Sequence, residues 1–182
     1  MLKFKEKIAP AKFSLEFDEH IPFIVEFGED PIGLPLYWRI GDGSKSLMEI
    51  ELNKKVGSVN CITLTSINLE NARSVKYALE SNEIEEIGSP TFELTNWPET
   101  IESRNYSDHF SDDFDSDINL DIGRDFISVI FKGCPKELRY IRNGSVRFGL
   151  DKYGFLSKID IMKLSTTEIN VINSIVQMEK NE

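Results

Sequence analysis

Residues 138–150 read Leu-Arg-Tyr-Ile-Arg-Asn-Gly-Ser-Val-Arg-Phe-Gly-Leu. Two runs of alternating character, 138–142 and 145–150, flank Asn143-Gly144, the dipeptide most typical of a tight hairpin turn. A third run, 155–162, follows the turn residues Tyr153-Gly154 and has the same alternation. The C-terminal part of the chain therefore predicts an antiparallel sheet.

The N-terminal third repeats this strand pattern. Apolar residues alternate with polar ones, and proline or glycine residues separate the runs. The expected strands cover residues 13–17, 23–27, 36–40, 47–52 and 59–67, with one more at 91–94. Together these runs predict a β-meander.

Two segments have helical spacing instead. From Asn68 to about Ser81, apolar residues can share one helix face, which predicts a short middle helix. At the C-terminus, Ser165 and Glu168 have the spacing of a capping box ahead of an apolar stripe. The predicted fold class is α+β: a predominantly antiparallel sheet of meanders and hairpins, a short middle helix and a C-terminal amphipathic helix.

Domain organisation has two interpretations. At 182 residues with 40% hydrophobic residues, the chain is expected to form a single domain over 1–182. Residues 50–62 weakly resemble residues 148–159, which suggests two related β-rich halves, about 1–81 and 107–182. The alternative is that turns of this composition are common between strands.

Charge and composition exclude several classes of protein. The net charge of −10 argues against direct nucleic-acid binding, which needs a basic surface. The sequence has no signal-peptide pattern, no apolar stretch long enough to span a membrane and no C-terminal lipidation motif. Cys61 and Cys134 lack any metal or redox spacing and are expected to be reduced thiols. We expect a soluble, cytoplasmic protein with no membrane partner; the sequence leaves the oligomeric state open.

The most unusual segment is Asp113–Ile122, Asp-Phe-Asp-Ser-Asp-Ile-Asn-Leu-Asp-Ile. As one strand it would place its acidic residues in a row on one face, roughly 6.6 Å apart. Residues 99–125 contain nine acidic and two basic residues, which leaves −7 of the total −10. A row of like charges needs water, cations or basic side chains beside it.

Three interpretations compete for this row. Calcium binding is disfavoured, because an EF-hand loop opening at Asp113 would have Ile118 where glycine is needed and Arg124 where glutamate is needed. Intramolecular pairing is favoured by the basic residues that follow, and Arg147 is expected opposite Tyr140 in the hairpin. Those basic residues are Lys132, Lys136, Arg139, Arg142 and Arg147. Docking of a basic protein partner is the third interpretation.

The sequence contains no recognisable catalytic motif. No nucleophile elbow, zinc-protease helix, P-loop or dinucleotide fingerprint is present, and the only histidines are His20 and His109. We expect no enzymatic activity, cofactor or metal; a hydrolase with two carboxylates is a third possibility that a pH profile would reveal.

The chain resembles the small acidic immunity proteins that bacteria encode beside contact-dependent or polymorphic toxins. The resemblance rests on the acidic segment, on residues 148–161 (Phe-Gly-Leu-Asp-Lys-Tyr-Gly-Phe-Leu-Ser-Lys-Ile-Asp-Ile) and on the Leu164-Ser-Thr-Thr-Glu168 helix cap. It implies binding of a cognate basic toxin domain, often a nuclease, and neutralisation by occlusion. The expected partner-binding residues are Asp112, Asp113, Asp115, Asp117 and Asp121, with Tyr106 and Phe110 as anchors.

A second function class is a small-molecule or peptide binding module with an aromatic-lined pocket. Its candidate lining residues are Phe13, Phe17, Phe23, Phe27, Tyr37 and Trp38. An ordinary hydrophobic core explains the same aromatic residues.

Overall fold

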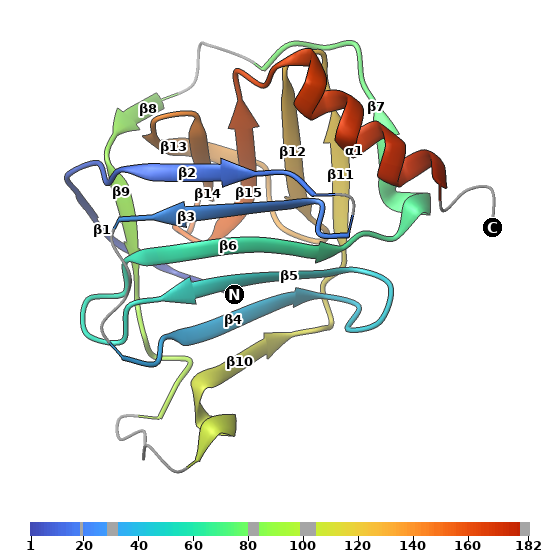
Figure 1. Ribbon diagram of the computed structural model, residues 1–182. Helices are drawn as coiled ribbons and strands as arrows, with labels where there is room; N and C mark the ends of the chain where they lie inside the picture. The colour runs from blue at the N-terminus through green and yellow to red at the C-terminus, as the bar shows by residue number, and fades with distance from the viewer. Residues whose placement is uncertain (19, 29–32, 80–83, 99–104, 179–182) are drawn as a thin grey trace.

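The structure, a computed structural model, describes residues 1–18, 20–28, 33–79, 84–98 and 105–178. Over these residues the chain forms two large β-sheets, a two-stranded ribbon and one C-terminal α-helix. Strands of the six-stranded sheet, in front in Figure 1, cross those of the seven-stranded sheet behind it. The expectation of a β-rich chain with a C-terminal helix is confirmed.

The six-stranded sheet is built mostly from the N-terminal strands predicted from alternation. All neighbours are antiparallel except β10, which joins the edge in parallel with β4. In spatial order the strands are β10 (Phe110–Asp113), β4 (Leu36–Gly41), β5 (Leu47–Leu52), β6 (Val59–Ser66), β3 (Phe23–Phe27) and β2 (Phe13–Glu16).

The seven-stranded sheet is antiparallel at its centre and has one parallel strand at each edge. Its order is β7 (Ala72–Ser74), β11 (Ile118–Ile122), β12 (Phe126–Phe131), β15 (Leu156–Met162), β14 (Val146–Asp151), β13 (Glu137–Asn143) and β8 (Ile84–Ile87). The edge strands β7 and β8 follow one another in the chain. These two consecutive strands therefore lie at opposite edges of the sheet.

A ribbon of β1 (Phe4–Ile8) and β9 (Ser89–Phe92) ties the two sheets together. The Phe92 amide donates to Gly57 O in the β5–β6 turn, at 2.8 Å, and the Phe4 amide donates to Gly154 O in the β14–β15 turn, at 2.8 Å. Each large sheet is thus hydrogen-bonded to the same ribbon.

One hydrophobic core lies between the two sheets. Strand alternation directs Trp38, Ile50 and Ile62 from one sheet and Val129 and Ile159 from the other into this core, all with 0% exposure. The opposite face of each sheet carries the polar residues, so each sheet has an inner apolar face and an outer polar face.

The C-terminal helix α1 (Thr166–Met178) begins with the predicted capping box. The Glu168 amide donates to Ser165 Oγ at 3.3 Å, and the Ser165 amide donates to Glu168 Oε2 at 2.6 Å. Ile169 and Ile172 are buried in the common core. In Figure 1 the helix lies across the upper ends of β12 and β11 and runs toward β7.

The predicted middle helix is wrong. Within the described part of residues 68–81, the chain forms a single 3-10 turn, η1 (Leu69–Asn71), and then extends as β7. Leu120–Ile122 of β11 pairs with Ala72–Ser74, and Arg73 forms an ion pair with Asp121 across that pairing. This pairing outweighs the weak helical preference that apolar spacing alone provides.

The central hairpin forms, but its pairing register is shifted by two residues from the expected one. Arg147 lies opposite Arg142, and Tyr140 lies opposite Gly149, because the loop consists of Gly144 and Ser145. The Arg147 guanidinium nevertheless stacks on the Tyr140 ring, with Cζ 4.0 Å from the ring centroid. The absence of a side chain at Gly149 leaves room for that ring, because a Cβ there would lie 3.0 Å from Tyr140 Cε1.

A helix with the length and apolarity needed to cross a bilayer does not occur among the described residues.

Candidate functional site

The expected row of aspartates on a single strand is wrong. Phe110–Asp113 is β10, at the edge of the six-stranded sheet, whereas Ile118–Ile122 is β11, in the seven-stranded sheet. Residues 114–117 form the turn by which the chain changes sheets. Aspartate and serine favour such turns, and the crossing separates carboxylates that would repel one another in one row.

Asp113 and Asp117, at the two ends of this turn, accept hydrogen bonds from other parts of the chain. Asp113 accepts a hydrogen bond from the indole of the buried Trp38 and lies 2.5 Å from the Met1 ammonium. Asp117 accepts from Ser46 Oγ at 2.5 Å and from Lys132 Nζ at 3.0 Å. Both carboxylates therefore tie separate parts of the chain together.

Asp121 is only 1% exposed and lies on the outer face of the seven-stranded sheet. It accepts two hydrogen bonds from Arg73, at 2.7 and 3.1 Å, and one from Tyr77, at 2.5 Å. Asp115 is exposed in the turn. Glu99, Glu102 and Arg104, which contribute to the acidic stretch of the sequence, lie outside the described residues.

Intramolecular pairing is thus extensive, but mostly with other partners than the sequence suggests. Of the five basic residues expected to neutralise the row, Lys132 pairs with one of its aspartates. Arg139 pairs with Glu86, Arg142 with Glu85, and Arg147 with Asp160.

A surface on which carboxylates outnumber cations lies elsewhere, on the outer face of the six-stranded sheet. Two cross-strand rows run over this face, in register from β2 to β10. Their carboxylates are Glu16, Glu26, Glu49, Glu51 and Asp112; their one cation is Arg39, so five minus one leaves −4. We call this surface the acidic face.

The electrostatics of the acidic face are unfavourable at Glu49 and Glu51. Partial burial raises the pKa of both carboxyls, and their mutual repulsion raises the pKa of Glu49 further, as nearby Glu26 does for Glu51. Arg39, opposite Glu49, lowers the pKa of Glu49 only in part, because its guanidinium is bound by Asp112 through hydrogen bonds of 2.7 and 2.9 Å. Among the described residues, no hydrogen bond or ion pair joins a cation to either glutamate.

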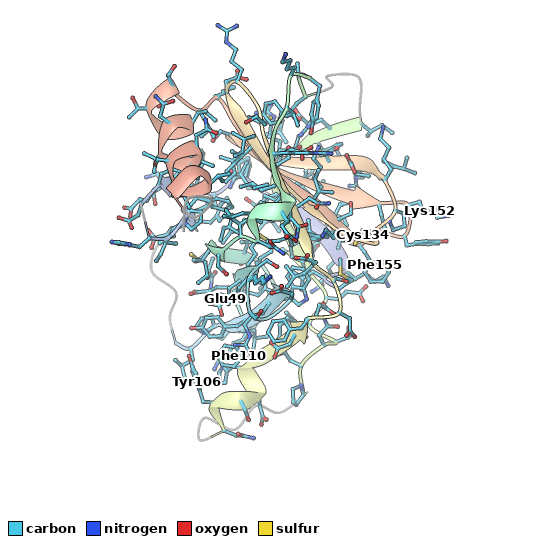
Figure 2. All side chains as sticks on the ribbon, turned by 90° about the vertical axis from the view of Figure 1, so that its right-hand side faces the viewer. Glu49, Tyr106, Phe110, Cys134, Lys152 and Phe155 are labelled. Carbon is cyan, nitrogen blue, oxygen red and sulfur yellow. The ribbon has the colours of Figure 1, made fainter. Side chains whose placement is uncertain are left out.

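An aromatic cluster borders the acidic face where β10 pairs with β4. The Tyr37 and Phe110 rings stack with centroids 4.9 Å apart, and Tyr106 packs edge-on against Phe110 at 5.2 Å. Tyr106 keeps 53% of its surface exposed. Figure 2 shows Glu49, Phe110 and Tyr106 on one side of the molecule and Cys134 toward the other.

Apart from Asp115, which is exposed in the turn between the sheets, the predicted site residues divide into two groups. Asp112, Tyr106 and Phe110 lie on or beside the acidic face, whereas Asp113, Asp117 and Asp121 are engaged within the fold. Glu49 and Glu51 were missed, although the alternation Leu47-Met-Glu-Ile-Glu-Leu52 could have placed both carboxylates on one outer strand face.

The aromatic residues proposed to line a pocket lie mainly in the core. Phe23 and Trp38 are completely buried and Phe27 is 7% exposed. Tyr37 lies on the opposite face of β4 from Trp38. It belongs to the aromatic cluster that borders the acidic face.

His109, one of the two histidines, is buried and has a structural role. It is 2% exposed, and its ring Nδ1 lies 2.8 Å from the Pro35 carbonyl oxygen. The Trp97 indole donates to the His109 carbonyl at 2.9 Å. These contacts fasten η2 (Tyr106–His109), which precedes β10 and presents Tyr106 beside the acidic face.

Comparison of the sequence with protein-family models and with curated proteins finds no match.

Proposed function

We propose that this protein is a non-catalytic binding protein that docks a basic protein domain on its acidic face and inhibits that domain by occluding it. The class of protein that fits this proposal is a cytoplasmic immunity protein, whose partner is the cognate toxin domain. Nucleases suit this role as partners, since their substrate-binding surfaces are basic.

The proposal rests on the incompletely compensated charge at Glu49 and Glu51, whose pKa values stay raised although Arg39 lies opposite Glu49. Each carboxyl is held near the other, in a partly buried position that disfavours its ionised form. A lysine or arginine from a partner would supply the missing counter-charge and lower both pKa values. Binding is therefore expected to weaken as the pH falls toward these raised pKa values, because protonated glutamates offer no charge to the partner.

The aromatic cluster complements this charge. Interface hot spots are enriched in tyrosine and arginine, and long-range attraction between complementary potentials accelerates association. Tyr106 offers exposed aromatic surface at the border of the acidic face, and Arg39 holds Phe110 beneath its guanidinium, with Cζ 4.4 Å from the ring centroid. Charge would thus steer the partner, and Tyr106 would anchor it.

The test is the association of the chain with the toxin domain encoded beside its gene, measured for matched charge variants. The double variant Glu49→Gln/Glu51→Gln removes two negative charges from the acidic face. The control, Glu70→Gln/Asp125→Asn, removes two exposed negative charges away from it. The first variant is expected to associate about three- to tenfold more slowly at low salt, with a flatter salt dependence, and the control close to the unmodified protein.

Equal slowing by both variants would mean that net charge alone matters and would remove the acidic face from the interface. Failure of the neighbouring toxin domain to bind the correctly folded chain would contradict the immunity function itself.

A further inference from the structure

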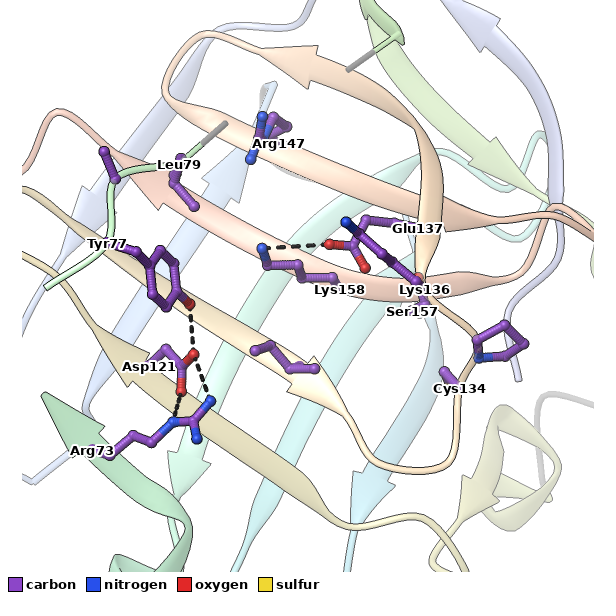
Figure 3. Close-up of a pocket in the computed structure, with 13 residues that line it drawn as sticks. Arg73, Tyr77, Leu79, Asp121, Cys134, Lys136, Glu137, Arg147, Ser157 and Lys158 are labelled. Carbon is purple, nitrogen blue, oxygen red and sulfur yellow. Dashed lines mark hydrogen bonds and ion pairs between the residues drawn. The ribbon is translucent and has the colours of Figure 1, made fainter. Parts of the chain in front are cut away.

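A cavity of about 530 Å³ lies on the outer face of the seven-stranded sheet, on the other sheet from the acidic face. The segment that leaves β7 forms part of its wall with Tyr77 and Leu79, and the β12–β13 connection forms another part with Cys134 and Lys136 (Figure 3). This volume is within the range of ordinary small-molecule sites.

A cross-strand row of four charged residues and one serine supports the cavity. Arg73, Asp121, Ser128, Asp160 and Arg147 lie in register on β7, β11, β12, β15 and β14. Asp160 is completely buried and accepts from Ser128 at 2.5 Å and from Arg147 at 2.7 Å. So many buried charges on the outer face of a sheet are costly and unusual in a surface that only meets water.

The carboxylates of this region already have their hydrogen-bond donors. Asp121 accepts from Arg73 and Tyr77, Asp160 also accepts from Lys158 at 3.1 Å, and Glu137 accepts from Tyr140 at 2.7 Å and lies 3.6 Å from Lys158. The groups that remain available to a ligand in this cavity are hydrogen-bond donors. An incoming ligand with cationic groups would meet acceptors that are already occupied.

Two lysines supply most of that donor capacity. Lys158 is 9% exposed, and its ammonium has three protons for two carboxylate neighbours. Lys136 is exposed at the rim, and among the described residues no hydrogen bond or ion pair engages its ammonium. Leu79, Ile130 and Pro135 add apolar surface to the same cavity.

We infer that this cavity binds a small amphipathic anion, an apolar body with one carboxylate or phosphate group held by Lys136 and Lys158. The apolar body lies against Leu79, Ile130 and Pro135. The cavity lies on the opposite sheet from the acidic face, so this site is independent of the proposed function.

The two cysteines provide the experiment. Cys134 lines the cavity, whereas Cys61 lies on β6 in the acidic face, opposite Glu26 and Glu51. Alkylation of each thiol by uncharged N-ethylmaleimide is followed by mass spectrometry at mildly alkaline pH. The probes are phenyl phosphate and phenylacetate; inorganic phosphate tests the anionic group alone, and 2-phenylethanol tests the apolar body alone.

The expected result is saturable protection of Cys134 by phenyl phosphate, phenylacetate or both, with Cys61 alkylated at an unchanged rate. Protection by one probe and not the other assigns the anionic group as phosphate or carboxylate. Lys136→Gln should weaken this binding about five- to tenfold, as expected for loss of a charge-assisted hydrogen bond at a partly exposed site. Lys55→Gln, an exposed lysine on the β5–β6 turn, should leave it unchanged.

The inference is overturned if neither aromatic anion protects Cys134 or if Lys136→Gln binds as well as the unmodified chain. Equal protection by 2-phenylethanol would eliminate the anionic group from recognition, and equal protection by inorganic phosphate would eliminate the apolar body.

Discussion

Asp117 illustrates how single aspartates hold this fold together. Burial alone would raise its pKa, but hydrogen bonds from Ser46, Lys132, the Ile118 amide and Asn71 lower the pKa to about 2. These donors come from the β4–β5 loop, from η1 and from the end of β12. One carboxylate thereby joins three parts of the chain at the crossing between the sheets.

Replacement of this residue, Asp117→Asn, should lower the free energy of unfolding by about 2 kcal/mol at neutral pH. Because the folded-state pKa lies below the unfolded value, the stabilisation is complete above about pH 4 and is lost as the pH falls toward 2. Urea unfolding of both proteins across this range measures the difference. A difference that stays constant down to pH 2 would show that ionisation of Asp117 is not its source.

For single residues, the sequence shows which ones are unusual but does not show which residues they contact. The acidic stretch is real, but whether Asp113 meets solvent or the Trp38 indole depends on a pairing between residues 75 positions apart. Local alternation contains no information about that pairing. The same limit hides the cavity, because Lys136 and Tyr77 meet only through the seven-stranded sheet.

Among the elements, the hairpins and the capped helix are predictable because their signals are local. Asn143-Gly144 indicates a turn, although the loop residues are Gly144 and Ser145, and Ser165 with Glu168 specifies a helix start. The elements that sequence misassigns or misses are the short strands β1, β7, β8 and β10. Each gains its conformation from pairing with a distant strand, which is antiparallel for β1 and parallel for the other three.

The contact between the β5–β6 turn and β9 can be tested by substitution of a glycine. Gly57 has a φ of 75°, and a Cβ there would lie 2.1 Å from the Phe92 carbonyl oxygen. Gly57→Ala should therefore cost about 2 kcal/mol of unfolding free energy or more, through both conformation and collision with β9. Denaturant titration provides the measurement.

Gly154 is the matched control, because its φ of 82° is similar but no atom lies within 4 Å of a Cβ built there. Gly154→Ala should cost only about 1 kcal/mol, the conformational part alone. Similar costs at both positions would show that contact with the ribbon adds nothing to the stability of the β5–β6 turn.

In the whole molecule, the two sheets have different electrostatic characters on their outer faces. The outer face of the six-stranded sheet carries more carboxylates than cations, beside an aromatic cluster. The seven-stranded sheet covers a row of paired charges with a cavity whose free groups are donors. Net charge alone predicts an acidic protein; only the assembled sheets divide its surface into these two regions.

The most direct test of the central claim, that the acidic face is the docking surface, is alkylation of the two thiols in the complex with the toxin domain encoded beside the gene. Burial raises the pKa of Cys61 to about 11, so both thiols are labelled slowly enough, at mildly alkaline pH, for their rates to be compared. If the acidic face is the docking surface, the partner protects Cys61 and leaves the alkylation rate at Cys134 unchanged. Protection of Cys134 with Cys61 still fully reactive would place the partner on the other sheet and contradict the account.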